Sequence, residues 1–472
     1  MIGELKPYPE MKDSGLPWLG KVPDHWDLER GKSLFRKVAR PVREEDEVVT
    51  CFRDGTVTLR RHRRVRGFTE SLKEIGYQGI RRGDLVIHAM DAFAGAVGVA
   101  DSDGKGTPVY AVCTPTERAN AHFYAYVVRE MARSQWIHAL AKGIRERSTD
   151  FRFESFAAQP LPLPPLPEQT AIVRFLDYAD RRIRRYIRAK QKLIKLLEEQ
   201  KQAIIHRAVT RGLDPDVPLK DSGVEWLGEV PEHWEVIALR FRYSQVLGKM
   251  LDSKRITGDH LVPYLRNTDV QWDSINCDDL PKMDIPEHEY PRYTLRAGDL
   301  LVCEGGEVGR SAVWEGQLDL CGFQKALHRL RPRRDERDRP RFMLYALRCA
   351  SRGGAFDDGH VSTIAHLTGD KLRAHRFPFP PSDEQRTIVG FLDGAQREVS
   401  EAKDRVRREV SLLRELRTRL IADAVTGKLD VRDAAARLPD EDSAVGEDDD
   451  LDEDEPALED MDLDAELEEI EA

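Results

Sequence analysis

The sequence predicts an α+β protein made of two duplicated α/β-mixed domains, separated by two long antiparallel helices that form a coiled-coil-like spacer with pseudo-two-fold symmetry. Three observations predict this class. One stretch of fourteen residues occurs twice, further short motifs recur after it in the same order, and each copy ends in a long run of helical hydrophobic periodicity.

The repeated stretch reads DSGLPWLGKVPDHW at 13–26 and DSGVEWLGEVPEHW at 221–234, with ten of fourteen positions identical. The motifs that follow pair as RRGDLV (81–86) with RAGDLL (296–301), PEQTAIVRFLD (167–177) with DEQRTIVGFLD (383–393), and AVTRGLD (208–214) with AVTGKLD (424–430). The offset grows from 208 to 215 or 216, which indicates a net insertion of about seven or eight residues near the beginning of the second copy. The matched Trp and His residues of the repeat are expected to anchor the opening segment of each domain.

Both copies have the same internal order. Glycine-punctuated β-rich runs such as GDLVIHAM and GDLLVCEG come first, and helical pieces such as AHFYAYVVREMAR and PRFMLYALRCASR follow. The expected parts are a first domain at 1–166, a first long helix at 167–212, a second domain at 213–381, a second long helix at 382–430, and an acidic tail at 431–472.

The two long helices carry apolar residues at steps of three and four. The predicted seam of the helix pair consists of Ile172, Leu176, Ile183, Leu193, Leu197 and Ile204 in the first helix, and of Ile388, Leu392, Val399, Val406, Leu413, Leu416 and Leu420 in the second. A helix of about 40 residues extends ~60 Å, which is longer than a small domain covers. We therefore expect the helices to pair with each other, antiparallel if a two-fold axis relates the copies. The proline-rich runs before both helices predict stiff hinges rather than ligands for proline-binding modules.

The net charge of −10 hides an uneven distribution. Residues 440–472 contain 19 Asp and Glu and no Lys or Arg, so the remainder carries an excess of nine basic residues. The basic body is a weak indication of a polyanionic partner. The tail is expected to be a disordered solubility segment, or alternatively an internal polyanion that competes for a basic surface.

No run approaches eighteen apolar residues and the N-terminus does not resemble a secretory signal, so a cytoplasmic location is expected. The six cysteines form no C-x-x-C pair and are expected to be reduced and mostly buried.

A catalytic set is not recognisable in the sequence. The P-loop, H-E-x-x-H, G-x-S-x-G and N-P-P-[YF] motifs are missing, and no His/Cys/Asp cluster has metal-ligand spacing. Asp299 and Glu304 could suggest a metal nuclease, but Gly306 occupies the position where a lysine would help activate water, and Asp299 is better explained as a turn residue matching Asp84. We expect neither a catalytic residue, a metal nor a cofactor in this chain.

With these motifs the sequence resembles the specificity subunits of type I restriction-modification enzymes. The resemblance rests on the paired DSG…WLG.VP.HW openings, the P-x-E-Q and S-D-E-Q helix starts, the IV.FLD that follows each, and the AVTxxLD helix ends, and it covers about residues 8–430. It implies two target-recognition domains on double-stranded DNA, each reading one half of a bipartite target, and helices that dock two modification (methyltransferase) subunits. S-adenosylmethionine, ATP and magnesium would then serve the methyltransferase and the motor/endonuclease subunits of the complex.

Candidate DNA-binding residues are taken from basic and divergent segments. They are Arg60, Arg61, Arg63, Arg64 and Arg66 in the first domain, and Lys249, Lys254, Arg255, Arg266 and Asn267 in the second. The first group could instead be a solvated charged loop. Two other functions stay open at this point, a nicking nuclease with unrecognised catalytic residues and a protein scaffold that never contacts DNA.

Overall fold

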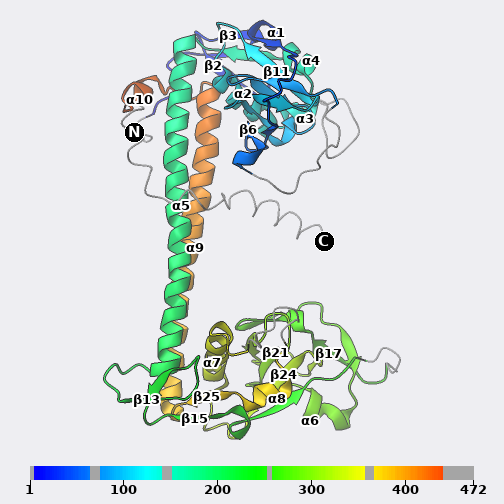
Figure 1. The fold of residues 1–472 in the computed structure, drawn as a ribbon, viewed down its shortest axis with the longest axis vertical. Coiled ribbons are helices and arrows are strands. Elements are labelled where there is room, and N and C mark those ends of the chain that lie inside the picture. Colours follow the sequence, from blue (N-terminus) through cyan, green and yellow to red (C-terminus); the bar gives the residue numbers. More distant parts are fainter. Residues whose placement is uncertain (1–4, 64–74, 141–150, 252–257, 357–365, 440–472) are drawn as a thin grey trace. The chain divides into compact units, whose positions relative to one another are not determined.

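The computed structural model describes residues 5–63, 75–140, 151–251, 258–356 and 366–439. Its contacts divide the chain into two units, residues 1–189 with 409–472 and residues 190–408. Each unit contains one globular segment and about half of each long helix, which are α5 (Leu166–Arg211) and α9 (Ser382–Val425) (Figure 1). The linear division into domains and helices expected from the sequence therefore differs from the division by contacts, because each globular segment packs on parts of both helices.

The helices begin and end close to the expected positions, with one difference. α9 ends at Val425 rather than at residue 430. Gly427 adopts a φ of 72°, which reverses the chain, and the amide of Lys428 donates to the carbonyl oxygen of Asp423 at 2.8 Å. A glycine in this left-handed conformation is a common way to close a helix.

The first unit is built on an antiparallel sheet in the order β4-β11-β8-β9, which are Phe35–Lys37, Tyr110–Pro115, Leu85–His88 and Val97–Val99. Leu85 and Ile87 alternate with Val86 along β8 and belong to a different hydrophobic cluster from it. Helix α2 (Ala121–Arg133) packs against β8 and β9 and contributes Phe123 to the cluster of Leu85 and Ile87. The sheet is buried on both faces because side chains alternate along a strand.

Shorter elements complete the first unit. The strands pair two by two, as β1 (Met11–Asp13) with β2 (Lys21–Pro23), β3 (Asp27–Arg30) with β12 (Pro160–Leu163), β5 (Val49–Cys51) with β6 (Val57–Leu59), and β7 (Gln78–Ile80) with β10 (Gly104–Gly106). The short helices are α1 (Gly31–Leu34), η2 (Arg60–His62), η3 (Ala92–Ala94), α3 (Trp136–Leu140), α4 (Phe153–Ala158) and α10 (Arg432–Ala436).

The second unit repeats this plan. Its main sheet has the order β16-β24-β21-β22, which are Tyr243–Leu247, Leu327–Pro332, Leu300–Cys303 and Ser311–Val313, and α7 (Pro340–Arg352) packs against β21 and β22. Leu300 and Val302 join the cluster that includes α7, whereas Leu301 and Cys303 join the cluster of the opposite face. The same strand order with the same covering helix confirms the predicted α+β class and the duplication.

The other strands of the second unit are β13 (Leu219–Asp221) with β14 (Glu229–Pro231), β15 (Glu235–Ala238) with β25 (Arg376–Phe379), β17 (Leu261–Leu265) between β20 (Lys282–Asp284) and β23 (Gly322–Phe323), and β18 (Val270–Gln271) with β19 (Ser274–Ile275). Its short helices are η4 (Leu239–Phe241), η6 (Asn267–Asp269), η7 (Glu287–Glu289), α6 (Tyr290–Tyr293) and α8 (Gly369–Ala374).

Part of each proline-rich run differs from expectation. The sequence predicts stiff hinges here, because proline does not continue a strand. In the structure, however, β12 pairs with β3 and β25 pairs with β15. Proline is compatible with such a strand because an edge position leaves alternate amides without a ladder partner.

The two helices pair antiparallel within each unit. In the first unit, Ile172 and Leu176 near the start of α5 cluster with Leu420 and Ala424 near the end of α9, and Ile183 and Ile187 cluster with Val410. In the second unit, Ile205, Ala208 and Val209 near the end of α5 cluster with Ile388 and Leu392 at the start of α9. The antiparallel arrangement predicted for the spacer helices is confirmed in both units.

The seam of α5 departs from the predicted one after Ile183. Leu193 is 39% exposed, whereas Ile187 and Ile205 are 1% exposed, so the buried face has moved by one residue. A 3.5-residue repeat and a straight helix of 3.6 residues per turn drift apart by about 20° per heptad. The same drift in α9 leaves Leu416 38% exposed, although Leu420 is buried again. The remaining predicted seam residues are buried or partly buried.

None of the helices in the described ranges is long and apolar enough to cross a membrane. All six cysteines are unpaired, and all but Cys277 are buried.

An ion pair joins the helices in the second unit and predicts a pH dependence. Nζ of Lys403 lies 2.7 Å from Oε2 of Glu198. Burial opposes ionisation of Glu198, but hydrogen bonds from Lys403 and Gln202 outweigh it and lower its pKa to about 2. Because the pKa of Glu198 is lower in the folded chain, the pair stabilises the fold at any pH above the ordinary carboxyl pKa of 4.5. That stability is lost as the pH falls from about 4.5 towards 2.

We therefore expect Glu198→Gln to lower the free energy of unfolding at pH 7 by about 1 kcal/mol, since the pair is only partly buried. The difference from the parent chain should shrink when urea unfolding is measured at pH 3.5. Glu199→Gln, at the exposed neighbouring position, is the control. A difference that stays the same at both pH values would show that the ion pair does not carry this stability.

Candidate nucleic-acid interface and helix junctions

A buried carboxylate joins the opening segment of the first unit to the start of α5. Nε1 of Trp26 donates to Oε1 of Glu168 at 2.9 Å, and the hydroxyl of Tyr8 donates to the same oxygen at 2.6 Å. Nε2 of His25 lies 2.8 Å from Oε2. Trp26 is fully buried and meets the ring of Phe123 edge to face. Burial, and then the neighbouring Glu168, raise the pKa of Tyr8, which keeps its hydroxyl a donor.

The second unit builds the same junction from the second copy of the motifs. Nε1 of Trp234 donates to Oε1 of Glu384 at 3.0 Å, and Nε2 of His233 lies 2.8 Å from Oε2. Trp234 meets Phe342 edge to face. The repeated HW dipeptide and the repeated E-Q dipeptide are therefore the two sides of one contact, which we call the helix junction.

The glutamine after each glutamate fixes the chain beside the junction. Gln169 donates to the carbonyl oxygen of Pro164 at 2.9 Å and accepts from the amide of Asn120, the N-cap of α2, at 2.8 Å. Gln385 makes the same two contacts with Pro380 and Arg339, at 2.9 and 2.8 Å. One side chain therefore connects the long helix, the proline-rich run and the helix on the sheet.

The end of the other long helix completes each junction. A Cβ on Gly427 would lie 2.2 Å from Cδ of Pro23 and 3.0 Å from the ring of Trp26, so only glycine allows this approach. Gly212 at the end of α5 also lies beside Trp234, but a Cβ there would be 3.3 Å from the ring. Its φ of 74°, rather than a clash, is what favours glycine at this position.

The FLD motif binds a tyrosine from the helix on the sheet. The hydroxyl of Tyr126 donates to Asp177 at 2.8 Å, and that of Tyr345 donates to Asp393 at 2.6 Å. These pairs hold α2 on α5 and α7 on α9. Sequence reasoning singled out the motif but not its partner, which lies about 50 residues earlier in the chain.

The basic residues predicted to contact DNA in the first unit lie at the end of β6 and in η2. Arg61 forms an ion pair with Glu47, and both side chains are more than half exposed. Arg63 lies 2.7 Å from Asp54 and over the ring of Phe52. Nε of Arg60 is 3.5 Å from the hydroxyl of Thr50. Arg64 and Arg66 lie outside the described residues.

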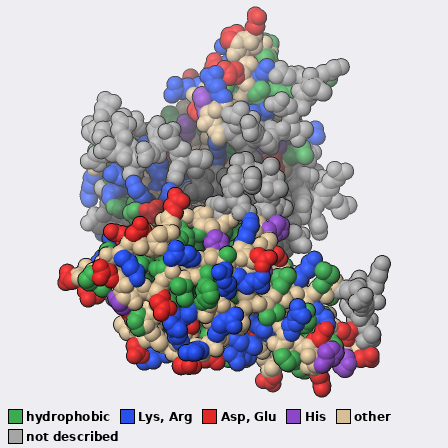
Figure 2. All heavy atoms as spheres, turned by 60° about the horizontal axis from the view of Figure 1, so that its bottom comes forward, with side chains coloured by type: hydrophobic (Ala, Val, Ile, Leu, Met, Phe, Trp, Pro, Cys, Tyr) green, Lys and Arg blue, Asp and Glu red, His purple; other side chains and the backbone are tan. Residues whose placement is uncertain are grey.

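Each described candidate of the second unit has a local partner of its own. Lys249 forms an ion pair with Glu289. Arg266 binds Asp269 through two nitrogens, with the shortest separation at 2.7 Å. Asn267 donates to the carbonyl oxygen of Gly305 at 3.2 Å, and its own oxygen is buried without a partner. Lys254 and Arg255 lie outside the described residues. On the face of this unit shown in Figure 2, Lys and Arg side chains are interspersed with apolar and acidic ones.

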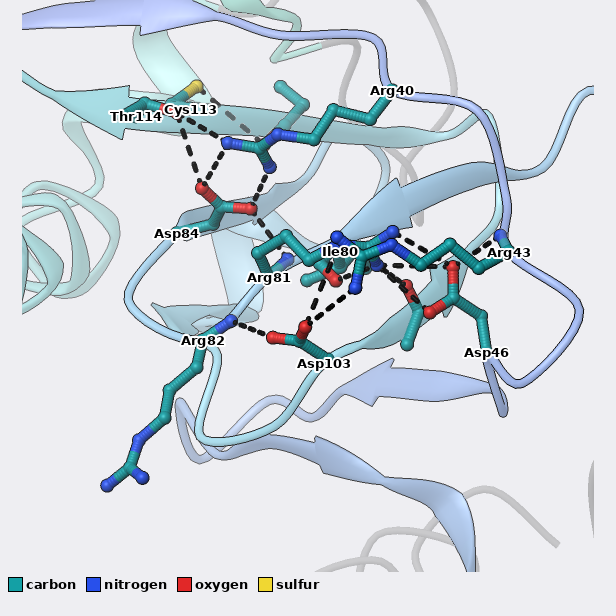
Figure 3. A network of polar contacts seen from close by, with 12 residues as sticks. Arg40, Arg43, Asp46, Ile80, Arg81, Arg82, Asp84, Asp103, Cys113 and Thr114 are labelled. Atoms are coloured by element: carbon teal, nitrogen blue, oxygen red, sulfur yellow. Dashed lines mark hydrogen bonds and ion pairs between the residues drawn. The ribbon is translucent and has the colours of Figure 1, made fainter.

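A network of arginines and aspartates that sequence reasoning did not identify surrounds the RRGD turn of the first unit (Figure 3). Asp84 accepts from the amide of Arg81 at 2.8 Å and forms an ion pair with Arg40. The guanidinium of Arg81 binds Asp46, with nitrogen–oxygen distances of 3.0 to 3.2 Å. The side chain of Arg82 points away from this network.

Asp299 has the matching place in the second unit. It accepts from the amide of Arg296 at 2.8 Å and from two nitrogens of Arg331 at 2.6 Å. Both aspartates thus stabilise a turn and an arginine, in agreement with the turn role expected for Asp299. The described residues contain no group of three or more His, Cys, Asp or Glu that could hold a metal ion.

The junction geometry predicts unequal stabilities of the two copies. Glu168 has three donors and a side chain 5% exposed, whereas Glu384 has two donors and a side chain 30% exposed. Removal of one partner leaves buried polar groups unsatisfied, at about 1–3 kcal/mol. We expect Glu168→Gln to destabilise segment 21–30 by about this amount, and Glu384→Gln to destabilise segment 229–238 by less.

Native-state hydrogen exchange measured on peptides from both segments separates the two effects. Glu154→Gln, whose side chain is 72% exposed, serves as the control and should change little. An equal or larger effect of Glu384→Gln would contradict the importance given to the third donor.

Comparisons with known proteins were made by sequence and by fold. No family model matches the chain. Two curated relatives come from Methanocaldococcus jannaschii. The specificity subunit of the type I restriction enzyme MjaVIII is 26% identical over 152 residues, which is 30% of this chain and 32% of that protein. A protein assigned provisionally as the specificity subunit of the type I enzyme MjaX is 20% identical over 434 residues, which is 88% of this chain and 96% of that protein.

Two solved structures share the fold. A chain from a structure that concerns complex assembly and conformational transition of the type I R-M system matches with a TM-score of 0.62 and 19% identity. The HsdS subunit from Thermoanaerobacter tengcongensis matches with a TM-score of 0.54 and 20% identity. Each match covers 86% of this chain and 98% of the other. The chain therefore has the fold of the type I restriction-modification specificity subunits, and the resemblance predicted from its repeated motifs is confirmed.

Proposed function

We propose that this chain is a non-catalytic DNA-recognition subunit that reads a bipartite target, one half-site with each globular segment. The observation that carries the proposal is the duplicated fold, in which matching junctions hold different inserts. Between β4 and β8 the first unit has the β5–β6 hairpin and η2, whereas between β16 and β21 the second has the β17 sheet, β18–β19 and α6. Two domains that share their main sheet and junction but differ in the inserted segments suit the recognition of two different DNA sequences.

The predicted DNA-binding residues lie in these inserts. Arg60, Arg61 and Arg63 belong to the insert of the first unit, and Lys249, Arg266 and Asn267 to that of the second. Ion pairs such as Arg61 with Glu47 are exposed and therefore weak, so a phosphate oxygen can replace the carboxylate. A nuclease remains the less favoured alternative, because the aspartate suspected of metal binding, Asp299, is already bound by Arg331.

The helix pair suits two further roles in this proposal. It sets the unread gap between the half-sites, and it docks two modification subunits through apolar side chains that the seam does not cover. Tyr186 and Leu412 in the first unit, and Leu196 and Phe391 in the second, are 48 to 63% exposed. The partners would supply S-adenosylmethionine, ATP and magnesium for methylation and cleavage, and motor subunits would join through them.

The gap is tested by lengthening both helices. An insertion of seven residues in each preserves the hydrophobic phase and adds ~10 Å, or about three base pairs. We expect genomic methylation profiles of hosts that carry the chain and its modification partner to show a wider gap with both half-sites unchanged. A changed half-site with an unchanged gap would contradict the proposed role of the helices.

The insert of the first unit is tested by salt dependence. Loss of a phosphate contact weakens binding to all sequences and reduces the slope of log affinity against log salt by about 0.9. We expect this result for Arg61→Gln with a duplex probe in fluorescence anisotropy. Glu199→Gln, on an exposed face of α5, should leave the slope unchanged. An unchanged slope for Arg61→Gln would exclude a phosphate contact at this residue.

A further inference from the structure

A basic cavity in the first unit lies where α2 meets the C-terminal half of α9. It measures about 380 Å³, and four arginines line it together with Phe93 and Tyr126. These arginines are Arg53, Arg129, Arg133 and Arg417. None of them was among the residues predicted from the sequence to bind DNA.

Three of the four arginines are neutralised by carboxylates. Arg53 lies 3.2 Å from Asp91, Arg133 binds Glu130 at 2.6 Å, and Arg417 pairs with Asp180. Arg129 differs, because it makes no hydrogen bond or ion pair with any residue that the structure describes. The cavity thus contains one guanidinium that is not paired directly with a carboxylate of the described residues.

The position of Arg129 is unfavourable for an isolated charge. Burial, followed by repulsion from Arg417, lowers its pKa, although the more distant charges of Asp54 and Asp180 act in the opposite direction. Its guanidinium lies against the β5–β6 turn, where a Cβ on Gly55 would be 2.6 Å from Nη1. It also borders a second cavity of about 190 Å³. A desolvated cation is costly without a counterion, so an anion from outside the chain would stabilise this arrangement.

The corresponding residue of the second unit, Arg348, is a buried arginine. Arg348 follows Tyr345 by three positions in α7, as Arg129 follows Tyr126 in α2. Burial and then Arg352 lower the pKa of Arg348, and its Nε is buried without a partner. Its Nη2 forms a long ion pair of 3.9 Å with Glu198, which also binds Lys403 at 2.7 Å.

We propose that Arg129 and Arg348 are phosphate contacts, one beside each half-site, that position the duplex on the two units. This inference rests on the proposed function. Residues that match in both copies should contact what is common to both half-sites, which is the sugar–phosphate backbone, whereas the divergent inserts contact bases. A guanidinium also binds a phosphodiester through two hydrogen bonds, which suits a cavity with one unpaired arginine.

The test uses Arg129→Gln and Arg348→Gln in the full chain, with a duplex of arbitrary sequence as the probe across a series of salt concentrations. Each variant should reduce the slope of log affinity against log salt by about 0.9. The melting temperature should stay unchanged or rise, because a buried, repelled charge is removed. Arg118→Gln is the control of equal charge, since Arg118 is exposed and 3.5 Å from Glu29.

Other outcomes overturn the inference. An unchanged slope with a lower melting temperature would show that these arginines only stabilise the fold. Tighter binding by Arg129→Gln would indicate that the cavity holds an internal anion, such as the acidic segment 440–472. If the parent chain itself does not bind duplex DNA at low salt, the proposed function fails and this inference fails with it.

Discussion

The contact of a glutamate at the start of each long helix with the opening segment of its unit is the interaction on which the rest of the fold depends. Glu168 and Glu384 each bind a tryptophan and a histidine from a segment about 150 residues away in the chain. The adjacent glutamine fixes the helix on the sheet, and a glycine at the end of the other long helix closes against the tryptophan. This polar contact links each globular segment to the start of a long helix, and hydrogen bonds to a charged group are strong where the site is buried, as it is at Glu168.

The duplication separates residues that both copies share from segments in which they differ. The residues that match between the copies belong to the frame, namely the junctions, the turn aspartates and the tyrosines bound by the FLD motif. The segments that differ lie between the first and the third strand of each main sheet and carry the basic residues of the proposed interface. Under the proposed function, such a division would let the sequence bound by one unit change while the junction that holds its globular segment stays the same.

Much of this architecture could be predicted from the sequence, because repeated motifs and helical periodicity are local signals. The pairing of His25 and Trp26 with Glu168 could not, since nothing local shows which distant residues meet. The apolar periodicity of α5 indicates the buried residues as far as Ile183 but not Ile187, because a heptad repeat and a straight helix differ in period. Arg129 cannot be singled out from the sequence, because a single arginine in an amphipathic helix has the same local pattern as a solvated one. Its missing counterion is visible only in three dimensions.

The most direct measurement of the central claim is the methylated sequence itself, determined genome-wide in a host that expresses this chain with a compatible modification subunit. If each globular segment recognises one half-site, the methylated motif should consist of two short, unrelated blocks separated by a gap of fixed length. A single continuous motif, or two blocks with a variable gap, would contradict it.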